Sequence, residues 1–324
     1  MSRLLLLLFC ALACTAANAQ EKYPSKTLRI VVPFAPGGST DIFARLVAER
    51  LAAGLGQPVM VENRAGASGN IGAEAAARSA PDGHTLLMAT TGVMAINGFL
   101  FKNLGYDAAR DLEPVIFIAS ISNVLAVPSE LPAKNVAELV ALAKKEPGKL
   151  TFASSGAGSS THLTAELFKS MARIDVVHVP FKGSGQALID VVAGRVSMIF
   201  DNMPSALPHI KGGKLRALGV TGAKRSGALP EVPTIAEAGA ELGLRGYESL
   251  SWSGLAVPAG TPRDIVQRLN RETALILLAP EMKQKLAEQG ADAVGGAPEA
   301  FAAHINAERG KWGRLVRERD IVIN

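Results

Sequence analysis

Two glycine-rich loops carry the residues best suited to chemistry in this chain. The first covers residues 33–41 (PFAPGGSTD) and the second residues 154–161 (SSGAGSST). Each joins a short apolar run to an amphipathic segment, and free backbone N–H groups at a helix N-terminus attract anions. Either loop alone could be a plain capped turn, with Ser39 or Ser159 as the N-cap residue. Asp41, in the first turn of the helix that follows the first loop, is interpreted as a structural residue that can brace the loop. If both loops face one cleft, an anion site is the better interpretation. Each loop would then hold one carboxylate of a dicarboxylate.

Three further residues are placed near these loops by the pattern of strand ends. Ala67 lies in the turn after the second predicted strand, Thr91 follows the third, and Asp201 ends a later strand. Ligands of open α/β sheets lie outside the carboxyl ends of the strands, so each of the three is a candidate ligand contact. Asp201 could select a ligand amino group, or it could cap a helix that begins before Pro204.

Signatures of catalysis are absent from the sequence. It contains no G-x-S-x-G elbow and no G-x-x-x-x-G-K-[ST] loop, and Thr161 stands where a dinucleotide-binding motif beginning at Gly156 would need its third glycine. The histidines show no metal-ligand spacing. His162, which lies in the second loop, is interpreted as a packing or capping residue. We therefore predict no catalytic residue, no metal site and no cofactor.

Alternating strand and helix patterns must position the two loops. Short β-branched runs separate amphipathic segments, which is typical of parallel α/β sheets. One helix is predicted from about Ser39 to Leu55, because Ile42, Leu46, Val47 and Leu51 fall on one stripe. The predicted strands are Leu28–Val32, Val59–Glu62, Thr85–Ala89, Leu150–Ala153, Val176–Val179, Val196–Phe200 and Leu215–Val220.

The chain resembles itself over two of these units. The stretch from Ile30 (IVVPFAPGGSTDIFARLVAERL) resembles the stretch from Leu150 (LTFASSGAGSSTHLTAELFKSM), and a strand, a Gly/Ser turn, a helix and a third strand follow each. The pattern predicts two copies of one βαβαβ unit, although generic α/β sequences can also resemble one another.

Two such units need connections, and two strand-like stretches could provide them. Residues 114–128 lie between the units, and residues 247–257 follow the second. We therefore predict an α/β fold with two hinged lobes, each a mainly parallel sheet flanked by helices. Lobe 1 would comprise residues 20–121 and 246–324, and lobe 2 residues 122–245.

The N-terminal residues follow the order of a secretory signal. Arg3 precedes the apolar run Leu4–Ala13, and small residues end in Ala17-Asn18-Ala19. We predict that residues 1–19 are a signal peptide, that it is cleaved after Ala19, and that the mature protein is exported to the periplasm. Lipid anchoring at Cys14 is the weaker alternative, because Leu12 stands where a lipoprotein signal prefers a small residue.

Composition limits the partners. The formal net charge is +5, and aromatic residues make up 5% of the chain. With no basic tract, no nucleic acid partner is expected. No later apolar stretch approaches the roughly 20 residues of a membrane helix. The mild positive charge suits an anionic ligand, but it is equally ordinary for a protein surface. We expect a monomer.

The ordered motifs together resemble a known family. The stretches YPSKTLRIVVPFAPGGSTDIFARLVAERL, VMVENRAGASGNIGAEAAA, PDGHTLLMAT and LTFASSGAGSSTHL are similar to those of the Bug receptors, the periplasmic solute-binding components of tripartite tricarboxylate transporters. The resemblance runs from Tyr23 nearly to the C-terminus. It implies a two-lobed periplasmic-binding-protein fold (type II, Venus flytrap) and a small carboxylate ligand, which could be a di- or tricarboxylate, an amino acid or an aromatic acid.

The resemblance also implies how the ligand is held. Family members hold ligand carboxylates chiefly through backbone N–H groups and ordered waters of the two loops, and Phe34 would form a wall of the cleft. The implied contacts are Gly37, Gly38, Ser39, Ser155, Gly156, Gly158, Ser159 and Ser160. The implied role is transport or sensing without catalysis, with transporter membrane subunits or a sensor as candidate partners. The alternative is an enzyme that acts on a small carboxylate on the same scaffold.

Overall fold

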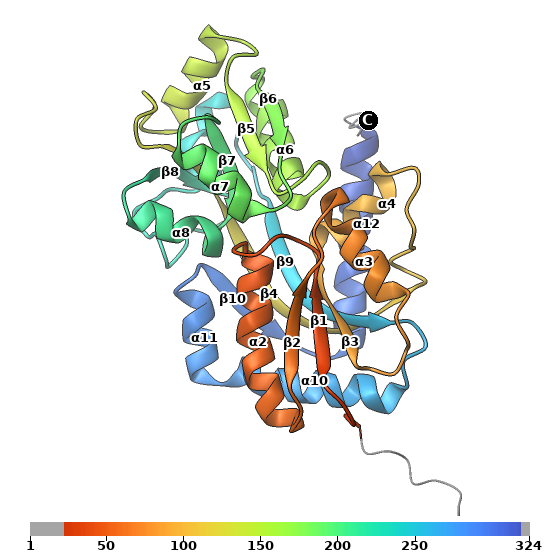
Figure 1. The fold of residues 1–324 in the computed structure, drawn as a ribbon. Helices are drawn as coiled ribbons and strands as arrows, with labels where there is room; N and C mark the ends of the chain where they lie inside the picture. The colour runs from red at the N-terminus through yellow and green to blue at the C-terminus, as the bar shows by residue number, and fades with distance from the viewer. Residues whose placement is uncertain (1–22, 319–324) are drawn as a thin grey trace, which may run out of the picture.

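The structure is a computed structural model that describes residues 23–318 as a two-lobed α/β molecule (Figure 1). The predicted signal peptide and Cys14 lie outside these described residues. None of the helices in the described part combines the length and apolarity that crossing a membrane requires.

A continuous path of paired strands runs through both lobes. The strands are β1 (Leu28–Val32), β2 (Val59–Asn63), β3 (Thr85–Thr90), β4 (Leu112–Pro128), β5 (Thr151–Ser154), β6 (Val177–Pro180), β7 (Met198–Asn202), β8 (Leu215–Val220), β9 (Leu250–Pro258) and β10 (Ala291–Gly295). Their order is β2-β1-β3-β9-β4-β7-β5-β6, and β8 and β10 also pair with β4. The strands predicted from the sequence agree with these bounds to within two residues.

Helices flank the sheet in both lobes. The α-helices are α2 (Ser39–Leu55), α3 (Asn70–Ala77), α4 (Asn97–Leu100), α5 (Val136–Lys145), α6 (Ser160–Ala172), α7 (Ser184–Val192), α8 (Met203–Lys211), α9 (Ile235–Ala238), α10 (Arg263–Leu278), α11 (Pro280–Ala287) and α12 (Pro298–Glu318). Three short helical turns complete the set: η1 (Ala67–Gly69), the π-helical η2 (Gly92–Ile96) and η3 (Ala240–Leu242). The predicted helix over Ser39–Leu55 has the same bounds as α2.

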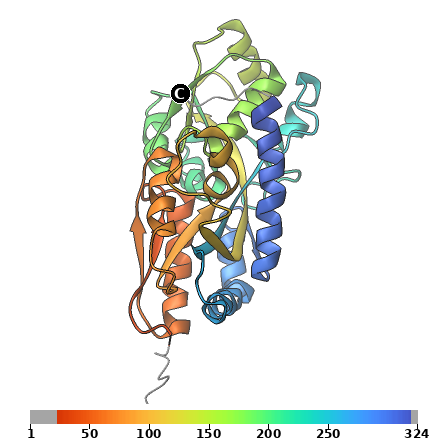
Figure 2. The same ribbon diagram turned by 90° about the vertical axis from the view of Figure 1, so that its right-hand side faces the viewer.

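Each lobe has a core on both faces of its part of the sheet. In the lobe that contains β1, Phe43 of α2 and Leu269 of α10 pack on one face, and Phe301 of α12 packs on the other. Figure 2 shows α2 and α12 on opposite sides of this lobe. In the lobe that contains β5, Phe168 of α6 and Leu188 of α7 belong to separate clusters. Both lobes therefore have the internal packing of a rigid unit.

The two predicted βαβαβ copies have the same topology. Three parallel strands lie in the order second, first, third, as β2-β1-β3 in one copy and β6-β5-β7 in the other. This confirms the internal repeat. Because parallel strands share one direction, the loops that follow β1 and β5 emerge at the carboxyl edge of each lobe, where α/β sheets bind ligands.

Strand β4 joins the two lobes. Its residues 112–122 pair with β9, and its residues 123–128 pair with β7 and β8. A second crossing lies beside this point, because the Ser249 N–H donates to the Thr221 carbonyl just before β9 begins. Two adjacent crossing strands let one lobe rotate against the other about a few residues.

Candidate ligand-binding cleft

The first glycine-rich loop is braced by an aspartate in the first turn of α2. Gly37 has a φ of +85°, and its N–H donates to Asp41 Oδ2 at 3.1 Å. Arg45 and Asn63 donate to the same carboxylate at 2.9 and 3.0 Å. Burial alone would raise the pKa of Asp41, but these hydrogen bonds hold it below its usual value. Asp41 is therefore structural, as its position in the sequence predicts.

The second loop is braced in the same way by a histidine. The Gly158 N–H donates to His162 Nδ1 at 3.0 Å. Ser159 is the N-cap of α6, and its Oγ accepts from the His162 N–H at 3.2 Å. The His162 ring stacks on His178 with centroids 3.9 Å apart, and burial lowers the pKa of His162 to about 3. His162 is therefore a neutral packing residue and hydrogen-bond acceptor, which confirms its interpretation.

The helix starts differ from the sequence prediction in one respect. Gly38 is the N-cap of α2 and Ser39 is its first helical residue, so Ser39 is not a capping residue. The equivalent residues of α6 are Ser159 and Ser160. A glycine can serve as N-cap because the Asp41 N–H, from which a capping side chain would otherwise accept, donates to the Gly38 carbonyl at 3.0 Å.

The two loops face each other across a small polar cavity. Both lobes and β9 contribute to its lining, which consists of Phe34, Gly38, Ser39, Thr40, Thr90, Gly92, Ser155, Ser160, Ser184, Asn202, Ser251, Trp252 and Ser253. No charged side chain is among them. The cavity has a volume of about 20 Å³, which is room for about one water molecule.

Hydrogen bonds between the lobes close the cleft around this cavity. They run from Asn202 Nδ2 to Ser39 Oγ at 2.6 Å, from the Ala35 N–H to the Lys182 carbonyl at 3.2 Å, and from Ser68 Oγ to the Ala157 carbonyl. A dicarboxylate is several times larger than a water molecule. This conformation is therefore closed, and the lobes must move apart for such a ligand to enter.

Some of the predicted site residues line the cavity and others support it. Those in the lining are Phe34, Gly38, Ser39, Ser155 and Ser160. Gly37, Gly158 and Ser159 lie behind them, with polar groups bonded to Asp41 or His162. Ala67 and Gly156 line a separate pocket that Phe34 and Ser155 also border. Thr91 is fully buried, and its Oγ1 accepts from the Trp252 N–H at 3.0 Å.

Asp201 lies behind the cavity wall and not in it. The carboxylate is fully buried, accepts from Ser205 Oγ at 2.6 Å and also accepts from Ser184 Oγ. Burial raises the pKa of Asp201 to about 6. The N-cap of α8 is Asn202. Asp201 thus orients two serine hydroxyls, one of which faces the cavity, and this role differs from both interpretations of the sequence.

Sequence reasoning missed two kinds of lining residue. Ser251, Trp252 and Ser253 come from β9, which a sequence shows only as a strand-like stretch without its neighbours. Thr90 and Asn202 were missed by one position. Thr91 follows the end of β3 and is bonded to the Trp252 N–H, whereas Asp201 neighbours Asn202 on β7, where side chains alternate across the strand. The strand pattern did indicate that the ends of these two strands lie near the cleft. Only the structure decides which of two neighbouring residues faces it.

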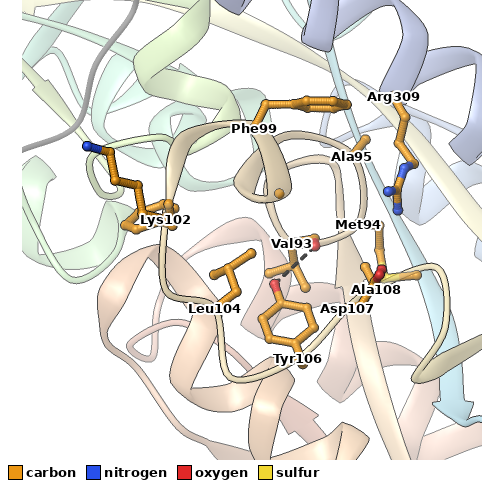
Figure 3. A pocket seen from close by; sticks show the side chains of 12 residues that line it. Val93, Met94, Ala95, Phe99, Lys102, Leu104, Tyr106, Asp107, Ala108 and Arg309 are labelled. Atoms are coloured by element: carbon orange, nitrogen blue, oxygen red, sulfur yellow. Dashed lines mark hydrogen bonds between the residues drawn. The ribbon is translucent and has the colours of Figure 1, made fainter.

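A larger pocket lies elsewhere on η2. Figure 3 shows it between α4, the segment 101–108 and Arg309 of α12, with a volume of about 280 Å³. The Tyr106 hydroxyl donates to the Val93 carbonyl at 3.1 Å beside it. None of the predicted site residues lines this pocket, so its size does not make it the site that the loops form.

Known proteins resemble this chain along most of its length. Residues 43–321 match the family model described as "Tripartite tricarboxylate transporter family receptor". Protein BugT of Bordetella pertussis is 38% identical over 322 residues, which is 98% of each chain.

Two solved structures share the fold as well as the sequence. R. palustris Rpa4515 with adipate is 41% identical, with a TM-score of 0.89 over 93% of this chain and 99% of that one. MatC (Rpa3494) from Rhodopseudomonas palustris with bound malate is 33% identical, with a TM-score of 0.85 over 91% and 100%. These matches confirm the two-lobed solute-binding fold and the resemblance seen in the sequence. The chain belongs to the tripartite tricarboxylate transporter receptor family.

Proposed function

We propose that this protein is a periplasmic receptor that captures a small carboxylate between its two lobes. The observation that carries the proposal is the pairing of two glycine-rich loops, each at the N-terminus of a helix, on opposite sides of one polar cavity. Helix N-termini favour anions because of their free N–H groups and the helix dipole. The adipate and malate of the two R. palustris relatives support this ligand class.

Neutral donors would hold the carboxylates. Within residues 23–318, the backbone N–H groups of Ser39, Thr40 and Ser160 donate no hydrogen bond to the protein, and all three residues line the cavity. They sit in the first turns of α2 and α6, one in each lobe. A dianion can therefore complete the hydrogen bonding of both helix ends and hold the two lobes together around it, in a form less tightly closed than this one.

Closure would be a hinge motion between the two lobes expected from the sequence. One lobe comprises residues 20–121 and 246–324, and the other comprises residues 122–245. The change of partners along β4, between Ser122 and Asn123, supports this division. The neighbouring crossing at Ser249 lies four residues beyond the expected boundary at 245. The protein would be exported by cleavage after Ala19 and act as a monomer that delivers its ligand to transporter membrane subunits or to a sensor.

Binding without turnover distinguishes this receptor from an enzyme on the same scaffold. No histidine, cysteine, lysine or carboxylate lines the cavity, and general acid–base chemistry needs a titratable group within reach of the substrate. The Asp201 carboxylate lies behind the wall and is fully buried, where it accepts from both Ser184 and Ser205. Purified protein should bind one equivalent of a dicarboxylate in calorimetry, and NMR of the same solution should show the acid unchanged after prolonged incubation. Steady formation of a product would favour the enzyme instead.

A further inference from the structure

Most side-chain hydroxyls in the cavity already have partners inside the protein. The pairs are Ser155 with Thr161 at 3.0 Å, Ser160 with Ser251 at 3.0 Å, and Ser184 with Asp201. Among the described residues, the lining hydroxyls without a hydrogen-bond partner are those of Thr40, Thr90 and Ser253, so a ligand meets few side-chain groups that are free to select it.

Two buried polar atoms of the lining are exceptions. Among the described residues, Thr90 Oγ1 and Asn202 Oδ1 are buried and have no hydrogen-bond partner. The Thr90 residue is only 7% exposed. Buried polar groups in native proteins are nearly always paired, and leaving one unpaired is unfavourable. Two unpaired polar groups in one cavity are therefore free to bond to a ligand.

The two residues hold equivalent places in the repeated units. Thr90 is the last residue of β3 in one lobe, and Asn202 is the last residue of β7 in the other. The loops after the first strands therefore face the carboxylates, and the ends of the third strands face another part of the same ligand. A ligand group that contacts both residues also bridges the lobes.

The chemistry of Asn202 restricts what this group can be. Its Nδ2 donates to Ser39 Oγ, so its free Oδ1 can only accept a hydrogen bond. A carboxylate offers acceptors alone and cannot satisfy it. A hydroxyl can donate to Asn202 Oδ1 and at the same time accept from the hydroxyl of Thr90.

An ammonium group fits this place less well than a hydroxyl. The lining contains no carboxylate, and Asp201 behind it already accepts from Ser184 and Ser205. A buried cation without an anionic protein partner is strongly unfavourable. We propose that the receptor prefers hydroxycarboxylates to the same acids without the hydroxyl, and that Thr90 and Asn202 recognise that hydroxyl. The proposal rests on the carboxylate-binding function above.

Matched pairs of acids test this preference by calorimetry. The probes are succinate with malate, glutarate with 2-hydroxyglutarate, and aspartate and glutamate as the amino counterparts. In the pair whose length fits, the hydroxy acid should bind at least about tenfold tighter than its parent. Equal affinities within every pair would overturn the inference and leave the carboxylate receptor intact, as would tighter binding of the amino acids. Failure of all six acids to bind would overturn both.

Two variants assign the preference to its residues. Thr90→Val removes the hydroxyl while keeping the shape, and Asn202→Ala removes the acceptor, so each should reduce the ratio of hydroxy-acid to parent affinity to within about twofold. Thr273→Val is the matched control, because Thr273 is buried in α10 and bonds only to the Leu269 carbonyl, so the ratio should not change. Thermal unfolding checks that each variant folds. A ratio that persists in both site variants would show that other groups recognise the hydroxyl.

Discussion

Asp41 and His162 show how one position can brace a binding loop with different side chains. Each is the third residue of its helix, and each accepts the N–H of the glycine just before the N-cap. The aspartate carries its charge because Arg45 and Asn63 stabilise it. The His162 Nε2 lies 3.8 Å from Glu166 Oε1, but burial against His178 outweighs this contact and lowers the pKa of His162, so the ring is neutral. The two loops thus share a geometry but differ in their response to pH.

Acid should destabilise the folded protein through its buried histidines. Burial lowers the pKa of His162 to about 3 and of His178 to about 4, whereas an exposed histidine titrates near 6.5. Between these values the unfolded chain binds more protons than the folded one. Each histidine therefore contributes its full stability above about pH 6.5, and the free energy of unfolding falls by up to about 1.4 kcal/mol per pH unit per group as the pH drops toward 4.

Asp201 opposes this effect. Burial raises its pKa to about 6, so between about pH 4 and 6 the folded state binds more protons at this carboxyl than the unfolded state does. Asp201→Asn removes the opposing contribution. Urea titrations at pH 7 and pH 4.5 should show a larger loss of stability on acidification in the variant than in the wild type. Equal losses would mean that Asp201 titrates normally in the folded protein.

At the scale of elements, β9 has two functions at once. It lies between β3 and β4 in the sheet, and residues 251–253 contribute to the lining of the ligand cavity. The next residue, Gly254, leaves the space that the Phe301 ring of α12 occupies. A Cβ at Gly254 would lie 2.3 Å from Phe301 Cζ and 2.6 Å from the Ile116 carbonyl oxygen. Because Gly254 has no side chain, α12 packs directly on the backbone of the strand whose preceding residues line the cavity.

Gly254→Ala should destabilise the fold without altering a ligand contact. The added methyl group must displace a ring and a backbone carbonyl, and overpacking of this kind costs about 1–3 kcal/mol. Urea unfolding should show that loss. Gly310→Ala is a control in α12 with no atom within 4 Å of its Cβ, and it should instead raise the stability by up to about 1 kcal/mol through helix propensity. Unchanged stability of Gly254→Ala would contradict the packing described for β9 and α12.

At the scale of the whole molecule, closure brings backbone against backbone. Gly185 at the start of α7 faces the first loop of the other lobe, and a Cβ there would lie 2.6 Å from the Pro36 carbonyl oxygen. Gly183 and Gly156 make similarly close approaches, to Ala35 and Ser68. These glycines of the second lobe therefore allow the two lobes to come into direct backbone contact when the cleft is closed.

Gly185→Ala should weaken binding by hindering the closure of the lobes around the ligand. Gly185 has no left-handed φ, so alanine fits the lobe itself, and the clash arises only between lobes. We expect cooperative unfolding, at least about tenfold weaker dicarboxylate binding, and a smaller decrease in radius of gyration on ligand addition in X-ray scattering. Gly227→Ala, in the same lobe with open space around its Cβ, should behave like the wild type. Unchanged binding by Gly185→Ala would show that the ligand does not need this contact.

The sequence by itself determined the family, the α/β class and the repeated unit. These features rest on local patterns: β-branched runs, glycine and serine in the turns, and apolar residues at helical spacing, which placed the helix Ser39–Leu55 at its observed bounds. Such patterns arise from backbone propensity and from which face is buried, and both act over a few residues. The braced loops were also foreseeable in part, since Asp41 and His162 were interpreted correctly as supporting residues.

Only the tertiary structure decided which polar groups face the ligand. The choice of Asn202 over Asp201 depends on strand register, because neighbouring side chains on a strand point in opposite directions. The choice of Thr90 over Thr91 depends on where β3 ends, because Thr91 is already the N-cap of the helical turn η2 and bonds to β9. The contribution of β9 depends on strand pairing with β3 and β4, which are more than 100 residues away in the chain. The unpaired state of Thr90 Oγ1 and Asn202 Oδ1 depends on every neighbour of the cavity at once. Register, pairing and hydrogen-bond satisfaction are properties of the packed molecule, so no local stretch of sequence contains them.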